Sequence, residues 1–354
     1  MSTGTPPEVS VIVACRNEAR HIRKFMDSVL AQQTHGIEWE LLIADGMSDD
    51  GTSDLIRDYA RRNPQVRPLE NSGKIVSTGL NTAIRAAKGE IIIRMDAHTE
   101  YQSDYLRKCV DTLRATDADN VGGPARTRAE SYIARAIAAA YHSRFSTGGG
   151  RFHQVSFEGY VDTVTYGCWY KSTLERLGLF DETLVRNQDD ELNLRLIRQG
   201  GRIWQSPRIV SWYHLRSSLS GLFRQYYQYG FWKVPVIRKH RVPASWRHLI
   251  PGCFLIWIVT LAVAATTSSI LRSPVLLLSL RLAAWTSGIY LLACIAASLP
   301  NARRDWTILP LLPLVFMIYH FSYGLGFLFG MIYWPLRKSK SVENMGSVLA
   351  GVTR

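Results

Sequence analysis

The chain has 354 residues, a formal net charge of +13, 47% hydrophobic residues and 20% charged residues. This length and apolar fraction allow about two domains and a sizeable core, which excludes an intrinsically disordered chain and a small disulfide-stabilised domain. The five cysteines include no Cys-x-x-Cys pair, which argues against a structural zinc site and favours a reducing compartment.

The chain before Leu249 alternates short apolar runs with helical patterns. Its first residues show no basic start followed by an apolar run, so no cleaved signal peptide is expected. The pattern predicts, in chain order, strand 9–15, helix 19–32, strand 40–44, helix 53–62, helix 76–87, strand 90–95 and helix 105–114. This alternation predicts an α/β domain with a mostly parallel sheet covered on both faces. Ligands bind such sheets beyond the carboxyl ends of the strands.

Acidic residues follow all three of these predicted strands. Glu18 follows the first strand, Asp45 the second and Asp96 the third, and no glycine-rich phosphate-binding motif follows any of them. A dehydrogenase or a P-loop enzyme is therefore not expected. Asp49, after the second strand, is better explained as a turn former. Asp96 and His98 are two residues apart and would point the same way in an extended segment, where they could ligate Mn²⁺ or Mg²⁺.

The excess positive charge lies in one region. Residues 192–304 contain no Asp or Glu but 15 Arg and Lys residues, which leaves the rest of the chain close to neutral. Long apolar runs follow at 249–271, 275–299 and 306–336, and a bilayer crossing needs about 20 apolar residues. Three such runs in series favour membrane-spanning segments over buried helices of a soluble protein.

The segment 216–248 mixes aromatic with basic residues. Aromatic rings favour the headgroup level of a membrane and Arg or Lys can reach anionic lipid, so the predicted partner is anionic membrane lipid and not nucleic acid. Basic residues also lie at 301–305 and after 336. The positive-inside rule places all three basic segments in the cytoplasm, which requires an even number of crossings. This favours a hairpin or re-entrant pair in the last run, with its Gly324, Gly326 and Gly330.

Several ordered motifs between Val9 and His214 resemble those of the inverting nucleotide-sugar glycosyltransferases of family 2, which have the GT-A fold. They are Asn17-Glu18 after the opening strand, the segment 44–52, the run 79–90, Asp96-Ala97-His98, Gly178-Leu179-Phe180-Asp181-Glu182 and Gln188-Asp189-Asp190-Glu191-Leu192. His98 replaces the second acid of the family's D-x-D, and Gln188 replaces the Glu before the base. The Asp-Ala-His variant with C-terminal spans most resembles the succinoglycan-assembly glucosyltransferases of the ExoA type. The Q-x-x-R-W motif of processive synthases is absent.

The resemblance implies a role for each matching residue. Asp189 falls at the catalytic base. Nucleotide contacts are expected from Ala14, Arg16, Glu18, Asp45, Lys74 and Asp96. Metal ligands are expected at Asp96, His98 and His214. Trp169, Tyr170 and Asp190 are acceptor candidates, the aromatic pair because sugar rings stack on such side chains. The competing structural explanations are core packing for the aromatic pair, helix capping for Asp190, a structural imidazole for His214 and a solvated surface charge for Lys74.

These expectations combine into one prediction. An α/β GT-A domain (1–215) is followed by a basic aromatic interfacial segment (216–248), transmembrane helices (249–336) and a basic tail (337–354). A helix at 131–144 is favoured as an ordinary surface helix. The chain is predicted to transfer a sugar, glucose, from a UDP-sugar to a polyprenyl-diphosphate-linked saccharide, as a multi-pass protein of the bacterial inner membrane with its catalytic domain in the cytoplasm. The alternatives are a polyprenyl-phosphate glycosyltransferase and an inactive membrane scaffold.

Overall fold

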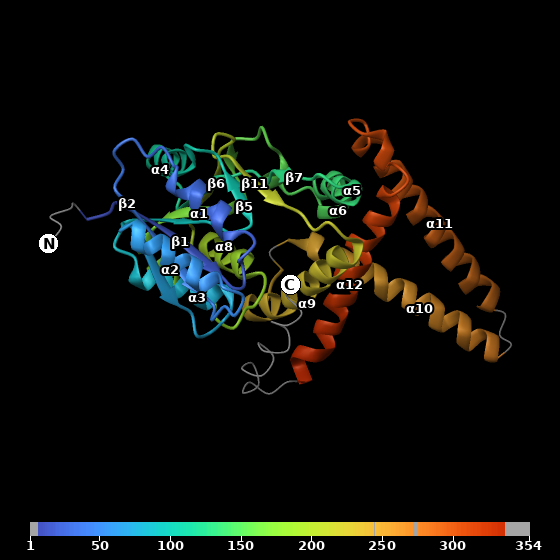
Figure 1. Ribbon diagram of the computed structural model, residues 1–354. Helices are drawn as coiled ribbons and strands as arrows, with labels where there is room; N and C mark the ends of the chain where they lie inside the picture. Colours follow the sequence, from blue (N-terminus) through green and yellow to red (C-terminus); the bar gives the residue numbers. More distant parts are fainter. Residues whose placement is uncertain (1–5, 244, 272–274, 337–354) are drawn as a thin grey trace. The chain divides into compact units, whose positions relative to one another are not determined.

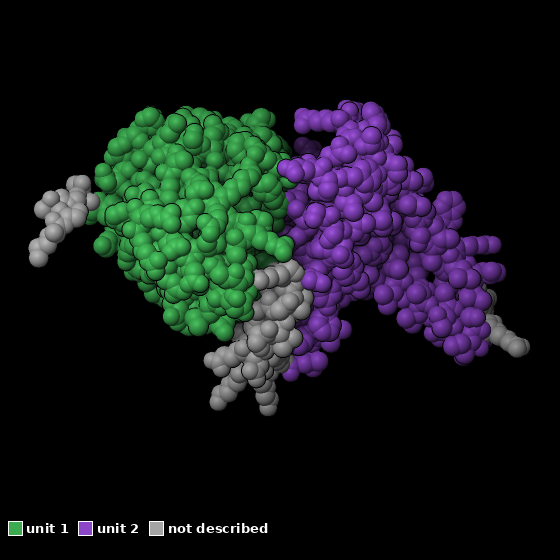
Figure 2. All heavy atoms as spheres, in the orientation of Figure 1, with its two compact units in different colours: residues 1–128, 150–214, 342–354 green, residues 129–149, 215–341 purple. Residues whose placement is uncertain are grey.

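The computed structural model describes residues 6–243, 245–271 and 275–336, which form two compact units (Figures 1 and 2). The first unit comprises 6–128 and 150–214, and the second comprises 129–149 and the described residues from 215 onward. The predicted basic tail, 337–354, lies outside the described residues. The division of the chain at 215, 248 and 336 remains a prediction.

An eight-stranded sheet forms the centre of the first unit, in the order β3-β2-β1-β4-β9-β6-β10-β8. Its strands are β1 (Val9–Cys15), β2 (Trp39–Asp45), β3 (Val66–Glu70), β4 (Ile91–Arg94), β6 (Asn120–Gly123), β8 (Gly159–Tyr160), β9 (Thr165–Tyr170) and β10 (Ile203–Gln205). The first four strands run parallel, and β9 runs antiparallel to both β4 and β6. A smaller sheet joins β5 (Thr99–Tyr101), β11 (Ser211–His214) and β7 (Thr127–Arg128). The predicted mostly parallel α/β fold is confirmed.

Side chains alternate along β1 between two hydrophobic cores, one on each face of the sheet. Val11 and Val13 contribute to one core and Ile12 to the other. The helices α1 (Ile22–Leu30), α2 (Thr52–Arg62) and α4 (Tyr105–Ala115) cover the first face, and α3 (Val76–Ala86), α7 (Lys171–Leu177) and α8 (Gln188–Arg198) cover the second. Burial of each such Val or Ile contributes about 1.5–3 kcal/mol, so the strand runs and helix faces seen in the sequence fix this architecture.

The second unit is helical. It contains α5 (Tyr132–Tyr141), α6 (Arg144–Thr147), α9 (Leu219–His240), α10 (Ile250–Ile270), α11 (Val275–Asn301) and α12 (Leu312–Leu336). Short 3₁₀ turns lie at Trp246–His248 and Trp306–Ile308 here, and at Arg151–His153 in the first unit. Three helices, Trp246–Ile270, Val275–Asn301 and Leu312–Leu336, are long and apolar enough to cross a membrane. In the last of them, 44% of the most apolar segment is buried inside the protein, compared with 17% and 11% in the other two. It is therefore the central helix of this unit.

The last apolar run forms one continuous helix from Leu312 to Leu336, so the hairpin or re-entrant pair expected there was wrong. Its glycines serve close packing instead of a turn. A Cβ atom at Gly326 would lie 1.9 Å from the carbonyl oxygen of Tyr227 on α9, and one at Gly324 would lie 2.7 Å from that of Pro251 on α10. Gly230 on α9 lies equally close to the backbone of α12. Small residues let helix backbones approach in this way at membrane helix contacts.

Residues 131–144, favoured above as a surface helix, instead belong to the second unit. Ala136, Ile137 and Ala140 of α5 are fully buried in a cluster with side chains of α11 and α12. The aromatic residues of 216–248 also differ from the expectation, because Phe231 and Trp232 are buried against Trp334 of α12. The aromatic character of this segment therefore reflects, in part, packing between helices.

One group of polar side chains inside the second unit is hydrogen-bonded without charge. The hydroxyl of Tyr290 on α11 lies 2.9 Å from Nδ1 of His320 on α12. Nε2 of the same imidazole lies 2.9 Å from the carbonyl oxygen of Phe145 on α6. Since a hydrogen bond satisfies each ring nitrogen, His320 links three helices at no desolvation penalty for an unpaired polar group.

Candidate active site

The carboxyl ends of β1 and β2 bring the first two acidic segments together. Cys15 and Asp45 are partners in the last register pair of these strands. The carboxylate of Asp45 accepts hydrogen bonds from the backbone N–H of Ser48, at 3.2 Å, and from the hydroxyls of Ser48 and Ser53. These bonds close the turn before α2 and fix the orientation of the carboxylate at the edge of the sheet.

The loop after β1 is fastened to the loop after β2. Asn17 adopts a left-handed conformation (φ 55°), and its N–H donates to Ser48 Oγ at 2.7 Å. The N–H of Glu18 donates to Thr52 Oγ1 at 2.7 Å. Asp50 accepts from the N–H of Ala19 at 3.1 Å, which gives it a structural role in the turn. The acids after β2 therefore divide into Asp45, which ends the strand, and residues that hold the loops.

The thiol of Cys15 lies near the acids that follow three strands. Its pKa is raised well above the usual value, first by burial and then by the negative charges of Asp45, Glu18, Asp96 and Asp50. These carboxylates come from the segments after β1, β2 and β4, which are neighbouring parallel strands whose carboxyl ends lie at one edge of the sheet. The structure therefore brings together the acidic strand ends on which the sequence prediction depended.

Beyond β4 the chain turns at once, so Asp96 and His98 do not lie on an extended segment as expected. The strand ends at Arg94, and the N–H of His98 donates to Asp96 Oδ1 at 2.9 Å. The N–H of Asp96 donates to the hydroxyl of Tyr101 at 2.7 Å. Because of this turn, His98 lies beside Glu18 of the loop after β1. Asp96 stays a predicted ligand.

Glu18, His21 and His98 form a cluster suited to a cation. One donor atom from each side chain lies within 4.8 Å of the others. Nε2 of His98 lies 2.8 Å from Glu18 Oε1, and the His21 and His98 rings meet edge to face with centroids 4.9 Å apart. Burial and the neighbouring His98 lower the pKa of His21, which favours the neutral imidazole that metal binding requires. Sequence analysis missed His21, although its spacing of three residues from Glu18 was a usable signal.

The predicted base, Asp189, pairs with a buried arginine. Asp189 lies in the first turn of α8, and its carboxylate accepts from the guanidinium of Arg94 at the end of β4. The Arg94 side chain is 8% exposed and Asp189 is 41% exposed, so the carboxylate is held from the protein side and open on the other. Burial acts to lower the pKa of Arg94, but the Asp189 charge outweighs it and the pKa is raised, so the arginine stays charged.

Arg94 was missed although it carried a signal, since it is an arginine inside an otherwise apolar strand run. Residues on β4 alternate between the faces of the sheet, and Ile92 belongs to the core beneath α3 and α8. Arg94 shares the face of Ile92, which is the face that α8 covers. The ring of Tyr166 on β9 lies 5.9 Å from the Arg94 guanidinium carbon and adds a cation–π contact.

The residues around Asp189 hold the helix in place. Glu191 is fully buried and pairs with Arg195 one turn later at 2.7 Å. Arg195 also donates to the carbonyl oxygens of Leu177 and Leu179 before α8, the latter at 2.7 Å. Gln188 is buried, and Asp190 lies between Asp189 and Glu191 in the first turn of the helix. The acidic run therefore combines an open carboxylate with a buried structural one.

His214 lies on the small sheet and pairs with an acid that sequence analysis did not single out. Its Nε2 lies 3.1 Å from Glu100 Oε1 on β5. Glu100 also accepts from Lys24 and Arg128, and hydrogen bonding from Lys24 is the largest cause of its lowered pKa. The charge of His214 is one of the smaller causes of the lowered His21 pKa, so His214 lies near the Glu18–His21–His98 cluster. Its imidazole, however, is paired with Glu100. Its metal role stays a prediction.

Two acceptor candidates lie away from this edge, and their acceptor role stays a prediction. Trp169 is 2% exposed and packs edge to face on Phe180 in the core. Tyr170 is opposite Ile91 in the register of β9 and β4, and so lies at the beginning of β4, whereas Asp96 follows its end. Core packing and the antiparallel direction of β9 explain both positions.

The remaining nucleotide candidates lie near the carboxyl edge. Ala14 packs close to Gly79 of α3, where an added Cβ would approach it to 2.8 Å. Arg16 packs its aliphatic part along Gly46, 3.1 Å from where a Cβ would lie. Lys74 is exposed in the loop between β3 and α3, in a left-handed conformation. Their nucleotide contacts stay predictions.

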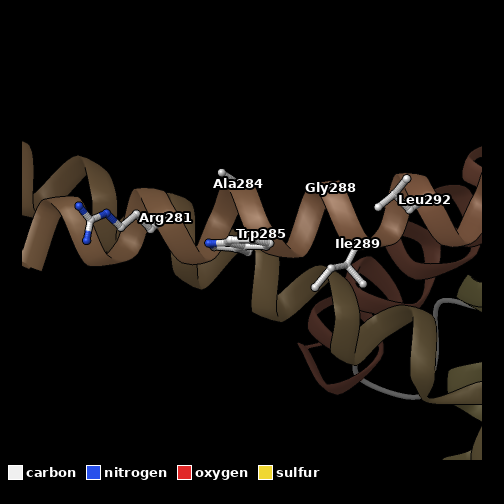
Figure 3. Close-up of a pocket in the computed structure, with 6 residues that line it drawn as sticks. All are labelled: Arg281, Ala284, Trp285, Gly288, Ile289 and Leu292. Carbon is white, nitrogen blue, oxygen red and sulfur yellow. The ribbon is translucent and has the colours of Figure 1, made fainter.

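A separate open pocket lies on the surface of α11. It is lined by Arg281, Ala284, Trp285, Gly288, Ile289 and Leu292 (Figure 3). All six residues come from one apolar helix of the second unit, so the pocket shares no residue with the acidic edge of the sheet. None of the six is acidic, so the pocket offers no carboxylate that could hold a cation or accept a proton.

Comparison with known proteins identifies the class of the chain. Residues 10–157 match the sequence model described as glycosyl transferase family 2. The chain is 31% identical over 243 residues to the succinoglycan biosynthesis protein ExoA of Rhizobium meliloti (strain 1021), covering 68% of this chain and 73% of that protein. The chain therefore belongs to glycosyltransferase family 2.

Two further comparisons agree with this assignment. The chain is 28% identical over 282 residues to the dolichyl N-acetyl-alpha-D-glucosaminyl phosphate 3-beta-D-2,3-diacetamido-2,3-dideoxy-beta-D-glucuronosyltransferase of Methanococcus voltae, covering 77% of this chain and 87% of that protein. Among solved structures, the fold is similar to that of the mannosyltransferase PcManGT from Pyrobaculum calidifontis in complex with GDP-Man and Mn²⁺. The TM-score is 0.56 at 21% identity, over 89% of this chain and 87% of the other. The predicted GT-A fold is confirmed.

Proposed function

We propose that this glycosyltransferase moves a hexose, glucose, from a UDP-sugar onto a hydroxyl of a lipid-linked saccharide, with inversion at the anomeric carbon. The observation that carries the proposal is the convergence of Asp45, Asp96 and the Arg94–Asp189 pair at one edge of a GT-A sheet. A helical unit with three apolar helices in the same chain supports a membrane-bound acceptor.

An inverting glycosyl transfer requires a base beside the acceptor hydroxyl. In an inverting transfer, the acceptor oxygen forms a bond to the anomeric carbon as the bond from that carbon to the diphosphate breaks. The hydroxyl proton passes to the base, and the bonding pair leaves with UDP. Asp189 is suited to be this base because its carboxylate is partly open and Arg94 fixes its position. Arg94 would act as a positioning residue.

The donor side would be bound by the acidic loops. Asp45 would accept a hydrogen bond from the uracil N–H, with Arg16, Glu18 and Lys74 around the nucleotide. A carboxylate and two imidazoles within 4.8 Å of one another fit a divalent transition ion. When bound, such an ion supplies charge neutralisation for the departing diphosphate. Asp96 and His98 are its expected ligands, and Mn²⁺ is the favoured ion.

The two relatives support a lipid-linked product in a surface or secreted glycan. One is named for succinoglycan biosynthesis and the other for transfer to a sugar on a dolichyl phosphate. The second name favours a sugar hydroxyl as acceptor over a bare lipid phosphate. We infer a multi-pass protein of the inner membrane whose catalytic unit faces the cytoplasm, where nucleotide sugars are made and where the polyprenyl-diphosphate saccharide would be extended.

The test combines donor and acceptor in one assay. The full chain in lipid nanodiscs is incubated with Mn²⁺, a panel of radiolabelled nucleotide sugars and a bacterial membrane lipid extract. We expect label from one UDP-sugar to enter a lipid fraction and to be released with an oligosaccharide on mild acid hydrolysis. Label released as a single sugar would support transfer to the lipid phosphate instead. UDP binding without any transfer would support the inactive scaffold.

A further inference from the structure

The loop after β1 contributes donor atoms to the same point in space as the segment after β4. The N–H of His21 donates to the carbonyl oxygen of Glu18 at 2.8 Å, which closes a helical turn between them. Side chains three residues apart in such a turn lie on one side of it. The turn therefore presents an oxygen and a nitrogen donor together toward His98, which comes from a strand end about eighty residues later in the chain.

We propose that Glu18, His21 and His98 form a cation site in which His21 is a ligand, and that this set selects Mn²⁺ or Co²⁺ over Mg²⁺. The inference rests on the proposed function only in assuming that a divalent ion serves the donor diphosphate. It adds two ligands from the loop after β1 to the segment after β4, and it limits the identity of the ion.

The chemistry of the donor set carries the selectivity. Mg²⁺ requires a near-octahedral shell of oxygen ligands, whereas imidazole is a ligand of first-row transition ions. Mn²⁺ shares the oxygen ligands of Mg²⁺ but, as a transition ion, accepts imidazole more readily than Mg²⁺ does. A site with one carboxylate and two imidazoles offers more nitrogen than oxygen, and it is therefore poorly matched to Mg²⁺. His98 replaces the second acid of the family motif, which exchanges an oxygen ligand for a nitrogen ligand. His21 adds a second nitrogen ligand at the same cation site.

The geometry allows an ion to enter. The Glu18 side chain is 13% exposed, whereas that of His98 is 44% exposed. One side of the cluster is thus largely covered by the protein, and the other is open to the solvent from which the ion and the diphosphate arrive. Electrostatics agree, because the carboxylates of Asp45, Asp50 and Asp96 lie near enough to act on Cys15 beside the cluster.

The experiment measures the ion directly, without sugar transfer. Mn²⁺ is titrated into the full chain in nanodiscs, and its affinity is read from the loss of the free Mn²⁺ signal in electron paramagnetic resonance. Pulsed measurements on the bound ion detect nitrogen couplings from coordinated imidazole. Mg²⁺ affinity is obtained by competition. We expect couplings from two imidazoles in the unaltered chain and tighter binding of Mn²⁺ than of Mg²⁺.

Substitutions of His21 test whether its imidazole nitrogen is a ligand of the ion. His21→Ala should weaken Mn²⁺ binding about tenfold or more and remove one imidazole coupling, with little change for Mg²⁺. His21→Asp should lower the Mn²⁺ preference, because an oxygen ligand replaces a nitrogen. The control is His35→Ala, an exposed histidine of the same unit outside the cluster, which should change nothing. His21 is itself exposed, and a thermal melt checks that each variant is folded.

The inference is overturned if the chain binds Mn²⁺ with a single imidazole coupling and His21→Ala leaves the affinity unchanged. Equal affinities for Mg²⁺ and Mn²⁺ would also overturn it. Sugar transfer is scored in a separate assay, so the two proposals fail separately. A chain that binds Mn²⁺ through His21 but transfers no sugar from any donor contradicts the proposed function alone. Transfer that needs no His21 nitrogen contradicts this inference alone.

Discussion

The two units of the chain are stabilised by opposite kinds of contact. In the first unit, buried charges are paired across the sheet and along α8, as in Glu40 with Arg67 and Glu191 with Arg195. In the second unit, helix backbones meet at glycines, and the buried polar groups of Tyr290 and His320 are hydrogen-bonded without charge. Charge chemistry therefore has to be examined in the first unit and side-chain size in the second.

The largest effect is expected from a single methyl group in the second unit. Gly326→Ala would place a Cβ 1.9 Å from the carbonyl oxygen of Tyr227, which forces α9 and α12 apart. Such overpacking typically costs about 1–3 kcal/mol, and we expect a loss at the upper end of this range because the contact is with backbone. The measurement is the midpoint of thermal unfolding in detergent, followed by size-exclusion chromatography.

The matched control for that change is Gly288→Ala on α11, where a Cβ would meet nothing within 4 Å. Its unfolding midpoint should equal or slightly exceed that of the unaltered chain, since alanine favours helix over glycine. Equal midpoints for the two variants would contradict the close contact between α9 and α12.

Asp189→Asn should have the next largest effect, chiefly on catalysis. It should also lower the stability of the first unit, because it leaves the largely buried cation of Arg94 underpaired. General-base catalysis contributes about 10²- to 10⁴-fold, so the turnover of sugar transfer should fall by about that factor. UDP–Mn²⁺ binding should persist, because the acids of the strand ends are unchanged. Turnover is measured with the labelled donor that the nucleotide-sugar panel identifies, and near-normal turnover would remove Asp189 from the role of base.

Glu191→Gln, two residues further along α8, should separate stability from chemistry. Glu191 is fully buried and Arg195 is 16% exposed, so loss of the negative charge leaves a largely buried cation underpaired. We expect a loss of about 3 kcal/mol in the free energy of unfolding, measured as a lower urea midpoint for the first unit.

A surface pair provides the control for that prediction. Asp58 pairs with Arg61 at 2.9 Å on α2, with both side chains largely exposed. Asp58→Asn makes the same acid-to-amide change in a helical pair, and it should alter the urea midpoint very little, since exposed pairs contribute about 0–1 kcal/mol. A comparable loss in both variants would show that burial is not the deciding factor.

The smallest effect should appear as a pH dependence of the first unit. Burial acts to raise the pKa of Glu40, but hydrogen bonds from the Lys88 N–H, Arg67 and Ser10 outweigh it, and the pKa is lowered from 4.5. A depressed carboxyl pKa stabilises the fold above the unfolded value, and this stabilisation is lost as the pH falls through the folded value.

The expected result is a urea midpoint that falls as the pH is lowered below about 4.5, with a shallower fall in Glu40→Gln. The comparison is made between the two chains at several pH values in the same detergent. An unchanged slope in the variant would assign the acid sensitivity to other carboxylates, such as Glu100, whose pKa is also lowered.

The strand ends were accessible to sequence analysis because their placement follows from a general rule. Parallel strands bring their carboxyl ends to one edge, so Glu18, Asp45 and Asp96 could be grouped without knowing any distance. The direction of individual side chains was not accessible. Asp96 and His98 do not lie on an extended segment because β4 ends at Arg94, and Trp169 points inward because it shares the core face of Ile92, its partner on β4.

Pairing partners far apart in the chain were also inaccessible. Nothing local in the sequence shows that Arg94 lies against Asp189, or that His21 lies beside His98. The short strands β6, β8 and β10 were missed because two to four residues give no clear alternation, and β6 and β8 also contain glycine. In the second unit, the glycines of α12 were interpreted as turn formers because their partners on α9 and α10 could not be seen.

The glycine contact between α9 and α12 has a consequence for how the protein is made. The ribosome synthesises α9 first, then α10 and α11, and α12 last, so the surface that receives α9 does not exist until the final helix has emerged. During that interval Phe231 and Trp232 have no α12 to cover them, and an uncovered apolar face invites association with other chains. Assembly of this unit therefore depends on synthesis of α12.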